Sequence, residues 1–520
     1  MKKNLPSATL TSVIIVLSFL MTPIFGTTQT FGINAGSGTT RTVELAQLWS
    51  FTSGLKFVTS PVVADGLVYA TSGTSGGSAV SVYCLNASSG TLIWNHTGLF
   101  DLFTVADGYV YVGESAVNGS VFTLYGVALC LNAYNGVQLW NYSAGTGFAA
   151  PVVGGDIVYF AGFNYTLSTG INIGFIYAFN AYTGEKIWNF LGPSGTRFDH
   201  DALVLASGKL YALSAVYSEK DASWHSGIYT FNAGTGEELW NYTTPGQFSS
   251  LVVAGNTVYV SSNFVNTTDY LDAKYSGGYV YNGGILALNA ISGIRMWDYP
   301  IDGSVESPIL SNGKVCAVSD NEVYAVNASD GAVIWGSAVK TNLGHARLVN
   351  GSLYVGSSDG VYCFDTSNGA VNWNFTANDY TTSSTTYPTY ADGIIYVGWN
   401  GPQSFSPITE HNFYALDAVS GEKIGNYTLG YTIKSSPTVV NSVIYVGASS
   451  VSEESPDFSG PGAVIALNST IAPLPPLTPS VSPSSSPLFP DSTTTLIAGV
   501  AIVVVVILAV GFFIRRKRAK

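Results

Sequence analysis

A short pattern that ends in tryptophan recurs along the middle of the chain, and this repetition constrains the fold more than any other feature. The first two copies are VYCLNASSGTLIW, ending at Trp94, and ALCLNAYNGVQLW, ending at Trp140. Later copies end at Trp188, Trp240, Trp297, Trp335 and Trp373; an eighth has Gly425 in the tryptophan position, and a ninth starts at Val464 without completing the pattern. Such self-similarity indicates one small structural unit stacked many times.

A second pattern lies between the copies of the first. It reads SPVVADGLVYATS from Ser60, APVVGGDIVYFAG from Ala150, SPILSNGKVCAVS from Ser307 and SPTVVNSVIYVGAS from Ser436, with diverged copies near Val105, Leu203, Val252, Leu348 and Tyr390. These runs alternate apolar residues, as strands do, and their ADG or SNG centres suit tight hairpin turns. Nine copies of this second pattern are present.

Together the two patterns describe four antiparallel strands, named A, B, C and D in chain order. A and B flank the ADG-type turn, C ends in LNA, and D carries the tryptophan, whose large ring would be buried between neighbouring sheets. The 57 Gly and 32 Tyr residues, with only 10% charged residues, favour short strands and turns over helices. We therefore expect an all-β region whose units stack radially; a long open solenoid is the competing arrangement.

The two ends of the repeat favour closure into a ring. The last unit has A, B and C strands but no D strand, whereas Trp49 lies in a lone strand before the first unit. These two fragments complete each other. The strand around Trp49 is therefore expected to supply the missing D strand of the last unit.

The AxNAxTGxxxW pattern resembles the tryptophan-docking motif of the PQQ-like (quinoprotein-type) β-propellers, from about Trp49 to Thr470. That family usually has eight blades, whereas nine units are counted here. The resemblance therefore implies a β-propeller of eight to nine four-stranded blades. It also implies a structural role for the tryptophans, which are Trp49, Trp94, Trp140, Trp188, Trp240, Trp297, Trp335 and Trp373.

Both ends of the chain indicate export to a membrane. Residues 1–26 are typical of a signal peptide, although an uncleaved anchor is the alternative. Residues 41–470 are the expected propeller, and residues 471–495 form a Pro/Ser/Thr-rich stalk. Residues 496–514 have the length and apolarity of one transmembrane helix, and the basic residues 515–520 are expected to stay cytoplasmic. This predicts a single-pass protein of the cell membrane with an extracellular propeller.

Charge and cysteine spacing exclude nucleic acid and a cysteine metal site. The net charge is −12; without the seven basic residues near the two termini, 13 basic residues face 32 acidic ones, so the middle carries −19 and repels phosphate backbones. Cys84, Cys130, Cys316 and Cys363 lack metal-ligand spacing, and equivalent positions in different blades are too far apart for a disulfide. We expect four buried free thiols.

Length variation falls almost entirely in the B–C and D–A connections, which share one end of the ring in a four-stranded meander. Variable loops on a rigid scaffold are where binding usually resides. The candidate contacts are Trp224, Tyr270, Tyr275 and Trp399, since exposed aromatic residues suit glycan or protein ligands. The alternative is that these loops only pack over the rim.

The starts of the A strands are expected to line the axis of the ring at the same end. Asp101, Asp201 and Glu306 fall in that register, with His200 and His345 close to the same level. Three carboxylates in an otherwise small and polar ring could hold a cation or an amine. The alternative is that they are solvated carboxylates without a ligand.

Twelve Asn-x-Ser/Thr sequons occur, and five directly follow the tryptophan position: Asn95, Asn141, Asn241, Asn374 and Asn426. The D strand is outermost in a propeller, so attached sugars are sterically reasonable there. The alternative is that a chain so rich in Asn, Ser and Thr contains several sequons by chance.

The motifs favour a non-enzymatic binding or scaffolding module for surface proteins or glycans. No GxSxG, HExxH or Cys/His nucleophile pattern occurs, and no cofactor is expected. The family resemblance implies one alternative, a PQQ-dependent dehydrogenase with Ca²⁺; such enzymes typically carry adjacent cysteines and a Glu/Asn/Asp calcium cluster, and no adjacent cysteines exist here. A second alternative is an envelope protein-assembly scaffold, although no lipobox cysteine follows the signal segment.

Overall fold

The computed structural model describes most residues between 41 and 471. Within that range it leaves out residues 54–55, 58, 74–78, 119–122, 144, 146, 167–170, 199–202, 219–222, 266–280, 378–383, 402–410, 434 and 451–461. The predicted signal peptide, transmembrane helix and basic tail, and the stalk beyond Ile471, lie outside the described residues. Across the ranges that are described, no helix has the length and apolarity of a membrane span.

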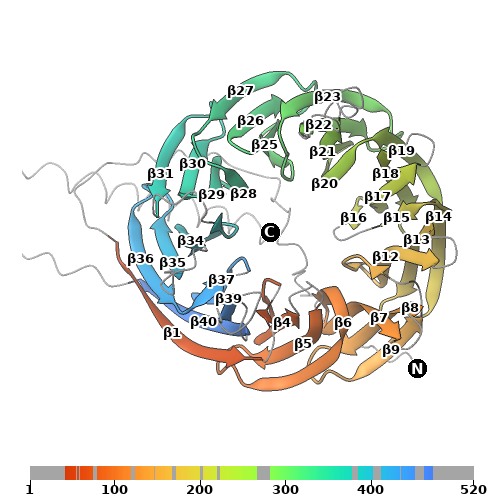
Figure 1. The fold of residues 1–520 in the computed structure, drawn as a ribbon, viewed down its shortest axis with the longest axis horizontal. Coiled ribbons are helices and arrows are strands. Elements are labelled where there is room, and N and C mark those ends of the chain that lie inside the picture. Colours follow the sequence, from red (N-terminus) through yellow and green to blue (C-terminus); the bar gives the residue numbers. More distant parts are fainter. Residues whose placement is uncertain are drawn as a thin grey trace, which may run out of the picture. The chain divides into compact units, whose positions relative to one another are not determined.

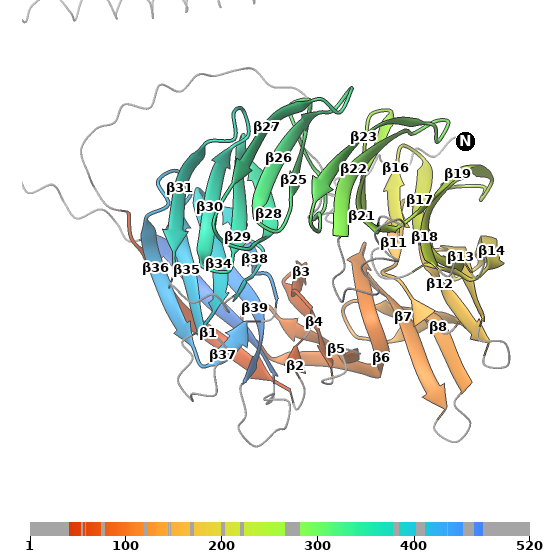
Figure 2. The same cartoon turned by 45° about the horizontal axis from the view of Figure 1, so that its top comes forward.

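The described strands form nine antiparallel blades arranged in a ring around one axis (Figure 1). Eight and nine blades were both open from the sequence, and the structure has nine. The fifth blade shows the simplest order, in which β20 (Gln247–Ala254), β21 (Thr257–Val265), β22 (Tyr281–Asn289) and β23 (Arg295–Asp302) pair consecutively. Figure 1 shows these four strands side by side from the axis outward, and Figure 2 shows β21, β22 and β23 side by side, so the four are the predicted A, B, C and D strands.

The first four blades include one strand that serves two blades. β6 (Leu92–Ala106) is the D strand of the first blade and continues as the A strand of the second. The first blade also contains β2 (Lys56–Phe57), β3 (Val62–Ala64), β4 (Leu67–Gly73) and β5 (Ala79–Asn86), and the second contains β7 (Tyr109–Asn118), β8 (Thr123–Asn132) and β9 (Gln138–Ser143). The third contains β10 (Gly147–Phe148), β11 (Val152–Gly154), β12 (Ile157–Thr166), β13 (Ile171–Asn180) and β14 (Lys186–Ser194), and the fourth contains β15 (Thr196–Arg197), β16 (Leu203–Ala206), β17 (Lys209–Ser218), β18 (Ser223–Asn232) and β19 (Glu238–Pro245).

The last four blades follow the same order. The sixth contains β24 (Ile309–Ser311), β25 (Lys314–Val318), β26 (Glu322–Asn327) and β27 (Val333–Ala338), and the seventh contains β28 (Leu343–Val349), β29 (Ser352–Ser357), β30 (Gly360–Asp365) and β31 (Val371–Thr376). The eighth contains β32 (Ser384–Thr385), β33 (Thr389–Ala391), β34 (Ile394–Asn400), β35 (His411–Asp417) and β36 (Lys423–Leu429). The ninth contains β37 (Tyr431–Ile433), β38 (Thr438–Val440), β39 (Val443–Ser450), β40 (Gly462–Ile471) and β1 (Val43–Thr52).

Proline divides the innermost strand into two short pieces in four of the blades. The prolines between the pieces are Pro61, Pro151, Pro388 and Pro437. Proline has no N–H to give to a strand ladder, so pairing with strand B stops and starts again. The A strand is consequently the least regular strand of these blades.

The ring closes through its two chain ends, as the sequence predicted. β1 pairs antiparallel with β40 along nearly its whole length, from Val43 opposite Ile471 to Thr52 opposite Ala463. The N-terminal strand is therefore the D strand of the ninth blade. Closure in this way gives β1 a partner and covers the edge of β40 that would otherwise be unpaired.

The A–B and C–D turns lie at one end of the ring. In the first blade the N–H of Ala87 donates to the carbonyl oxygen of Gly66 at 2.9 Å, and an equivalent bond joins the two turns in all nine blades. Asp65 and Gly66 have φ values of 51° and 75°, the left-handed conformation that an Asp-Gly turn accommodates. The B–C and D–A connections fall at the opposite end. These two ends are called the turn end and the loop end.

Each docking tryptophan reaches into the next blade. Trp188 donates from Nε1 to the carbonyl oxygen of Ala233 at 2.9 Å, and a Cβ on Gly236 would lie only 2.5 Å from its ring. The same carbonyl accepts a bond from the Tyr159 hydroxyl at 3.0 Å. All eight tryptophans are buried and make the equivalent bond, to Ala87, Ala133, Ala181, Ala233, Ala290, Ala328, Thr366 and Ala418. Each of these rings therefore joins its blade to the next one.

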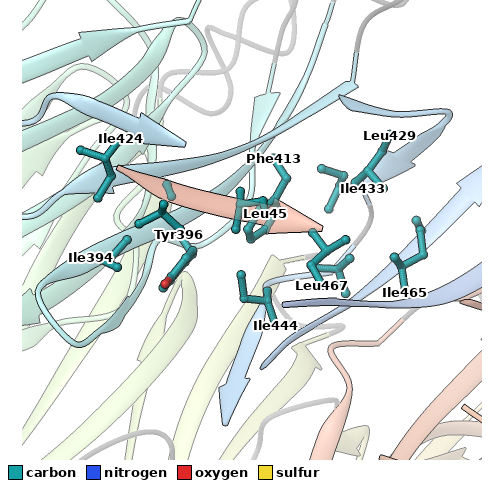
Figure 3. Packing of buried hydrophobic residues seen from close by; sticks show 14 of the residues in the cluster. Leu45, Ile394, Tyr396, Phe413, Ile424, Leu429, Ile433, Ile444, Ile465 and Leu467 are labelled. Atoms are coloured by element: carbon teal, nitrogen blue, oxygen red, sulfur yellow. The ribbon is translucent and has the colours of Figure 1, made fainter. Parts of the chain in front are cut away.

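The interface between the eighth and ninth blades is built differently, because the N-terminal strand occupies it. In the other eight units a glycine stands four residues before the tryptophan position, but Leu45 stands four residues before Trp49. Leu45 packs into a core with Phe413 of the eighth blade and Leu467 of the ninth (Figure 3). A Cβ on Gly425 would lie 2.5 Å from the carbonyl oxygen of Val43. The unit without a tryptophan therefore faces the unit without the docking glycine.

Restoring the repeat residue by Gly425→Trp is expected to lower the free energy of unfolding by about 1–3 kcal/mol, because the indole would overpack the space that β1 fills. Urea denaturation followed by circular dichroism measures the change. Gly336→Trp is the matched control, since Gly336 lies on an exposed D strand and a Cβ there meets Tyr324 only at 3.4 Å. A stabilising effect of Gly425→Trp would show that β1 does not exclude the ring.

Candidate functional site

Three side chains from successive blades meet where the inner strands begin, at the loop end. Glu306 precedes β24, His345 lies in β28, and Tyr387 precedes β33. Nδ1 of His345 lies 3.6 Å from Oε2 of Glu306, and the rings of His345 and Tyr387 stack with centroids 3.5 Å apart and planes 12° apart. The carboxylate and the imidazole are both partly exposed. Glu306, His345 and Tyr387 are called the axial cluster.

Backbone hydrogen bonds hold the axial cluster in place. The N–H of Glu306 donates to the carbonyl oxygen of Val318 at 2.9 Å, which ties the start of the sixth blade's inner strand to strand B. The N–H of Thr386, the residue before Tyr387, makes the equivalent 2.9 Å bond to Gly398 in the eighth blade. His345 lies within β28 itself, at a shift in its pairing with β29. The rigid sheets, rather than long loops, therefore set the positions of these three groups.

The axial cluster combines a carboxylate, an imidazole and a phenol ring. A protonated His345 would form an ion pair with Glu306, and a neutral one offers a ring nitrogen as an acceptor. The stacked rings add an apolar, polarisable surface beside these polar groups. Within the described ranges, no group of three or more His, Cys, Asp or Glu side chains is arranged to hold a metal ion. The arrangement suits recognition of a polar ligand.

Two of the five predicted axial residues, Glu306 and His345, come together in this cluster. Asp101 lies in β6, but its side chain is not described, and His200 and Asp201 lie outside the described residues. The complete ring of three acids therefore stays a prediction. Sequence reasoning missed Tyr387, although it follows the axial register position Thr386 just as His345 follows Gly344.

Trp399 is buried, so it cannot contact a ligand at the surface as the sequence predicted. It is only 2% exposed in β34 and packs with Tyr354 and Tyr414 in the core between the seventh and eighth blades. β34 continues to Asn400, whose side-chain amide exchanges two 2.8 Å hydrogen bonds with the backbone of Ile433. The sheet therefore extends farther toward the loop end than the loop lengths suggested. The side chain of Trp224, and Tyr270 and Tyr275, are not described.

The four cysteines are buried free thiols, as expected. Burial raises the pKa of the Cys84, Cys130 and Cys316 thiols to about 12 and that of Cys363 to about 11, so the reactive thiolate is disfavoured near neutral pH. The PQQ enzymes were expected to need adjacent cysteines and an acidic calcium cluster. The described residues supply neither of these features.

A ring of four-stranded blades locked by tryptophans that dock onto the next blade defines a quinoprotein-type propeller. A family model described as outer membrane protein assembly factor BamB matches residues 37–215, 172–318, 207–375 and 319–401, which together span residues 37–401. The chain belongs to this family of PQQ-like β-propeller repeat proteins. None of the curated proteins compared with it matches.

Several solved propellers are similar to this chain. BamB from Moraxella catarrhalis is 15% identical with a TM-score of 0.44, covering 82% of this chain and 100% of its own. A europium-containing methanol dehydrogenase is 13% identical with a TM-score of 0.47, covering 82% of this chain and 93% of its own. The quinohemoprotein alcohol dehydrogenase ADHIIG from Pseudomonas putida HK5 is 15% identical with a TM-score of 0.47, covering 86% of this chain and 78% of its own.

Proposed function

We propose that this chain is a non-enzymatic binding or scaffolding module of the cell surface, with protein or glycan ligands. The observation that carries the proposal is the axial cluster. Glu306, His345 and Tyr387 come from three different blades and present a carboxylate, an imidazole and a phenol at the loop end. Binding sites are commonly built from a few polar groups that converge beside aromatic surface.

The difference between the two ends of the ring supports a binding site at the loop end. At the turn end the same backbone hydrogen bond recurs in all nine blades, so one blade differs little from the next. At the loop end only residues 358–359 separate β29 from β30, whereas residues 266–280 separate β21 from β22. Loops that differ from blade to blade give each part of the loop end its own surface, which a ligand can recognise specifically.

The surface location is proposed from the two ends of the sequence. The apolar residues 496–514 and the basic residues 515–520 are typical of a single transmembrane helix with a cytoplasmic tail. With residues 1–26 acting as an export signal, the propeller lies outside the cell.

Envelope protein assembly is a second candidate, and the family match favours it. The family model that matches residues 37–401 is named for an outer membrane protein assembly factor. A scaffold of this kind would bind other envelope proteins rather than glycans. The chemical class of the captured ligand therefore separates the two candidates.

The test uses residues 41–471 as a secreted ectodomain on a glycan array and against solubilised envelope proteins. We expect one ligand class to be retained, and expect the double variant His345→Ala/Tyr387→Ala to bind it at least about ten-fold more weakly. Val419→Ala is the matched control, because Val419 is 75% exposed in a turn at the turn end. Equal loss in the control would contradict the choice of the loop end. Tight PQQ binding with dye-linked alcohol oxidation would contradict a non-enzymatic role.

A further inference from the structure

Five of the sequons share one structural position. Each asparagine directly follows the tryptophan position in the outermost strand of its blade: Asn95 in β6, Asn141 in β9, Asn241 in β19, Asn374 in β31 and Asn426 in β36. All five lie opposite equivalent residues of strand C, at Tyr83, Leu129, Tyr229, Tyr362 and Tyr414. The outer wall of the ring therefore repeats one sequon geometry in five of nine blades.

Both functional groups of these sequons face outward. Side chains alternate along a strand, so the asparagine and the hydroxyl residue two positions later point to the same side. All five asparagines are exposed, and so are the hydroxyl residues Thr97, Ser143, Thr243, Thr376 and Thr428. The residue between them is half-buried in every case. A bulky sugar on any of these asparagines would project away from the blade.

Two other sequons, at Asn86 and Asn327, offer an internal contrast. Oδ1 of Asn86 accepts bonds from the N–H and the hydroxyl of Ser88, at 3.0 and 2.7 Å. Oδ1 of Asn327 accepts the same pair from Ser329, at 2.9 and 2.8 Å. Each asparagine is half-buried in the C–D turn, which carries a docking glycine, and its own Oδ1 is engaged in closing that turn. A glycan there would have to displace the contacts that close the turn. Two outer-wall hydroxyls also form hydrogen bonds, Thr97 with Ser81 and Thr428 with Asn412, but the asparagines of those sequons are exposed.

We propose that the five outer-wall sequons carry N-linked glycans and that the sequons at Asn86 and Asn327 do not. This rests on the proposed function, since N-glycosylation requires export of the propeller. In three of these blades an exposed apolar residue, Ile93, Leu139 or Leu239, stands two positions before the asparagine. At about 3.3 Å per residue the sugar would start within roughly 7 Å of it. The glycans would cover the outer wall and leave the ends of the ring for ligands.

The third blade allows the proposal to be tested by adding a site. Its outer strand reads Asn189-Phe190-Leu191 at the same register, with Asn189 exposed and Leu191 56% exposed, but it lacks the hydroxyl residue. Leu191→Thr completes a sequon there, and Leu191→Ala is the matched control without one. The full chain and both variants would be expressed in a cell line whose secretory pathway attaches N-glycans. Surface biotinylation and glycopeptide mass spectrometry report export and site occupancy.

We expect surface-labelled protein with glycans on the five outer-wall asparagines, none on Asn86 or Asn327, and one additional glycan, on Asn189, in Leu191→Thr alone. Surface-labelled protein with empty outer-wall sites, or with Asn86 and Asn327 occupied equally, would overturn the inference and leave the proposed function standing. Protein that never reaches the surface would overturn the proposed location and the inference together.

Discussion

Replacing Trp188 with alanine is expected to lower the free energy of unfolding by about 3–5 kcal/mol. The substitution removes a buried ring that packs against Gly236 and Phe231 of the next blade, and it leaves a cavity between two rigid sheets. It also removes the N–H that donates to the Ala233 carbonyl. Denaturant unfolding of the ectodomain, followed by circular dichroism, measures the loss.

Tyr159→Phe separates the packing of the indole from the hydrogen bond. That variant removes only the second donor to the Ala233 carbonyl, which keeps its bond from Trp188. We expect it to cost about 1 kcal/mol. If Trp188→Ala were no more destabilising than Tyr159→Phe, docking of the ring would not hold neighbouring blades together.

Sequence reasoning recovered the ring because its signals are local and repeated. The spacing from glycine to tryptophan, the Asp-Gly turns and the unmatched strand at Trp49 each occur within a few residues of chain. It did not reveal that a tyrosine of strand B shares one carbonyl with the tryptophan, as Tyr159 shares Ala233 with Trp188. That acceptor lies more than forty residues along the chain from either donor, so only the packing of two blades identifies it.

The structure explains why Gly425 replaces the tryptophan of the other units. Leu45 stands where the other units have the docking glycine, and it belongs to the unit that Gly425 faces. Two departures from one repeat, hundreds of residues apart, are thus complementary across a single interface. The pairing becomes visible only once β1 is placed in the ninth blade.

The candidate site was less predictable than the fold. The repeat register predicted that Glu306 and His345 lie at the same height along the axis of the ring. The stacking of the Tyr387 ring on His345 depends on how neighbouring blades pack, which the repeat pattern does not show. Trp399 was misjudged because loop length was taken as a measure of exposure, whereas β34 runs on to Asn400 and buries the indole. The length of a connection in the sequence does not show where a strand ends.

Removing the N-terminal strand is expected to abolish the monomeric fold. A chain that starts at Ser53 loses the burial of Val43, Leu45 and Trp49, worth about 1.5–3 kcal/mol each. The sum is comparable with the entire stability of a typical domain, about 5–15 kcal/mol. The deletion also exposes the edge of β40, whose unpaired backbone groups favour association with other chains. Size-exclusion chromatography with light scattering should show aggregates in place of a monomer.

A chain that starts at Arg41 is the control, since it keeps β1 intact, and it should remain a monomer. Adding a synthetic peptide of residues 41–53 to the shortened chain during refolding should restore the monomer, because the β40 edge accepts β1 through backbone hydrogen bonds that do not require a covalent link. A shortened chain that stays monomeric and melts at the control's temperature would mean that β40 and the Gly425 interface do not need β1. The ring would then be held by the seven remaining tryptophan interfaces without closure, which its repeated blade-to-blade contacts alone are not expected to achieve.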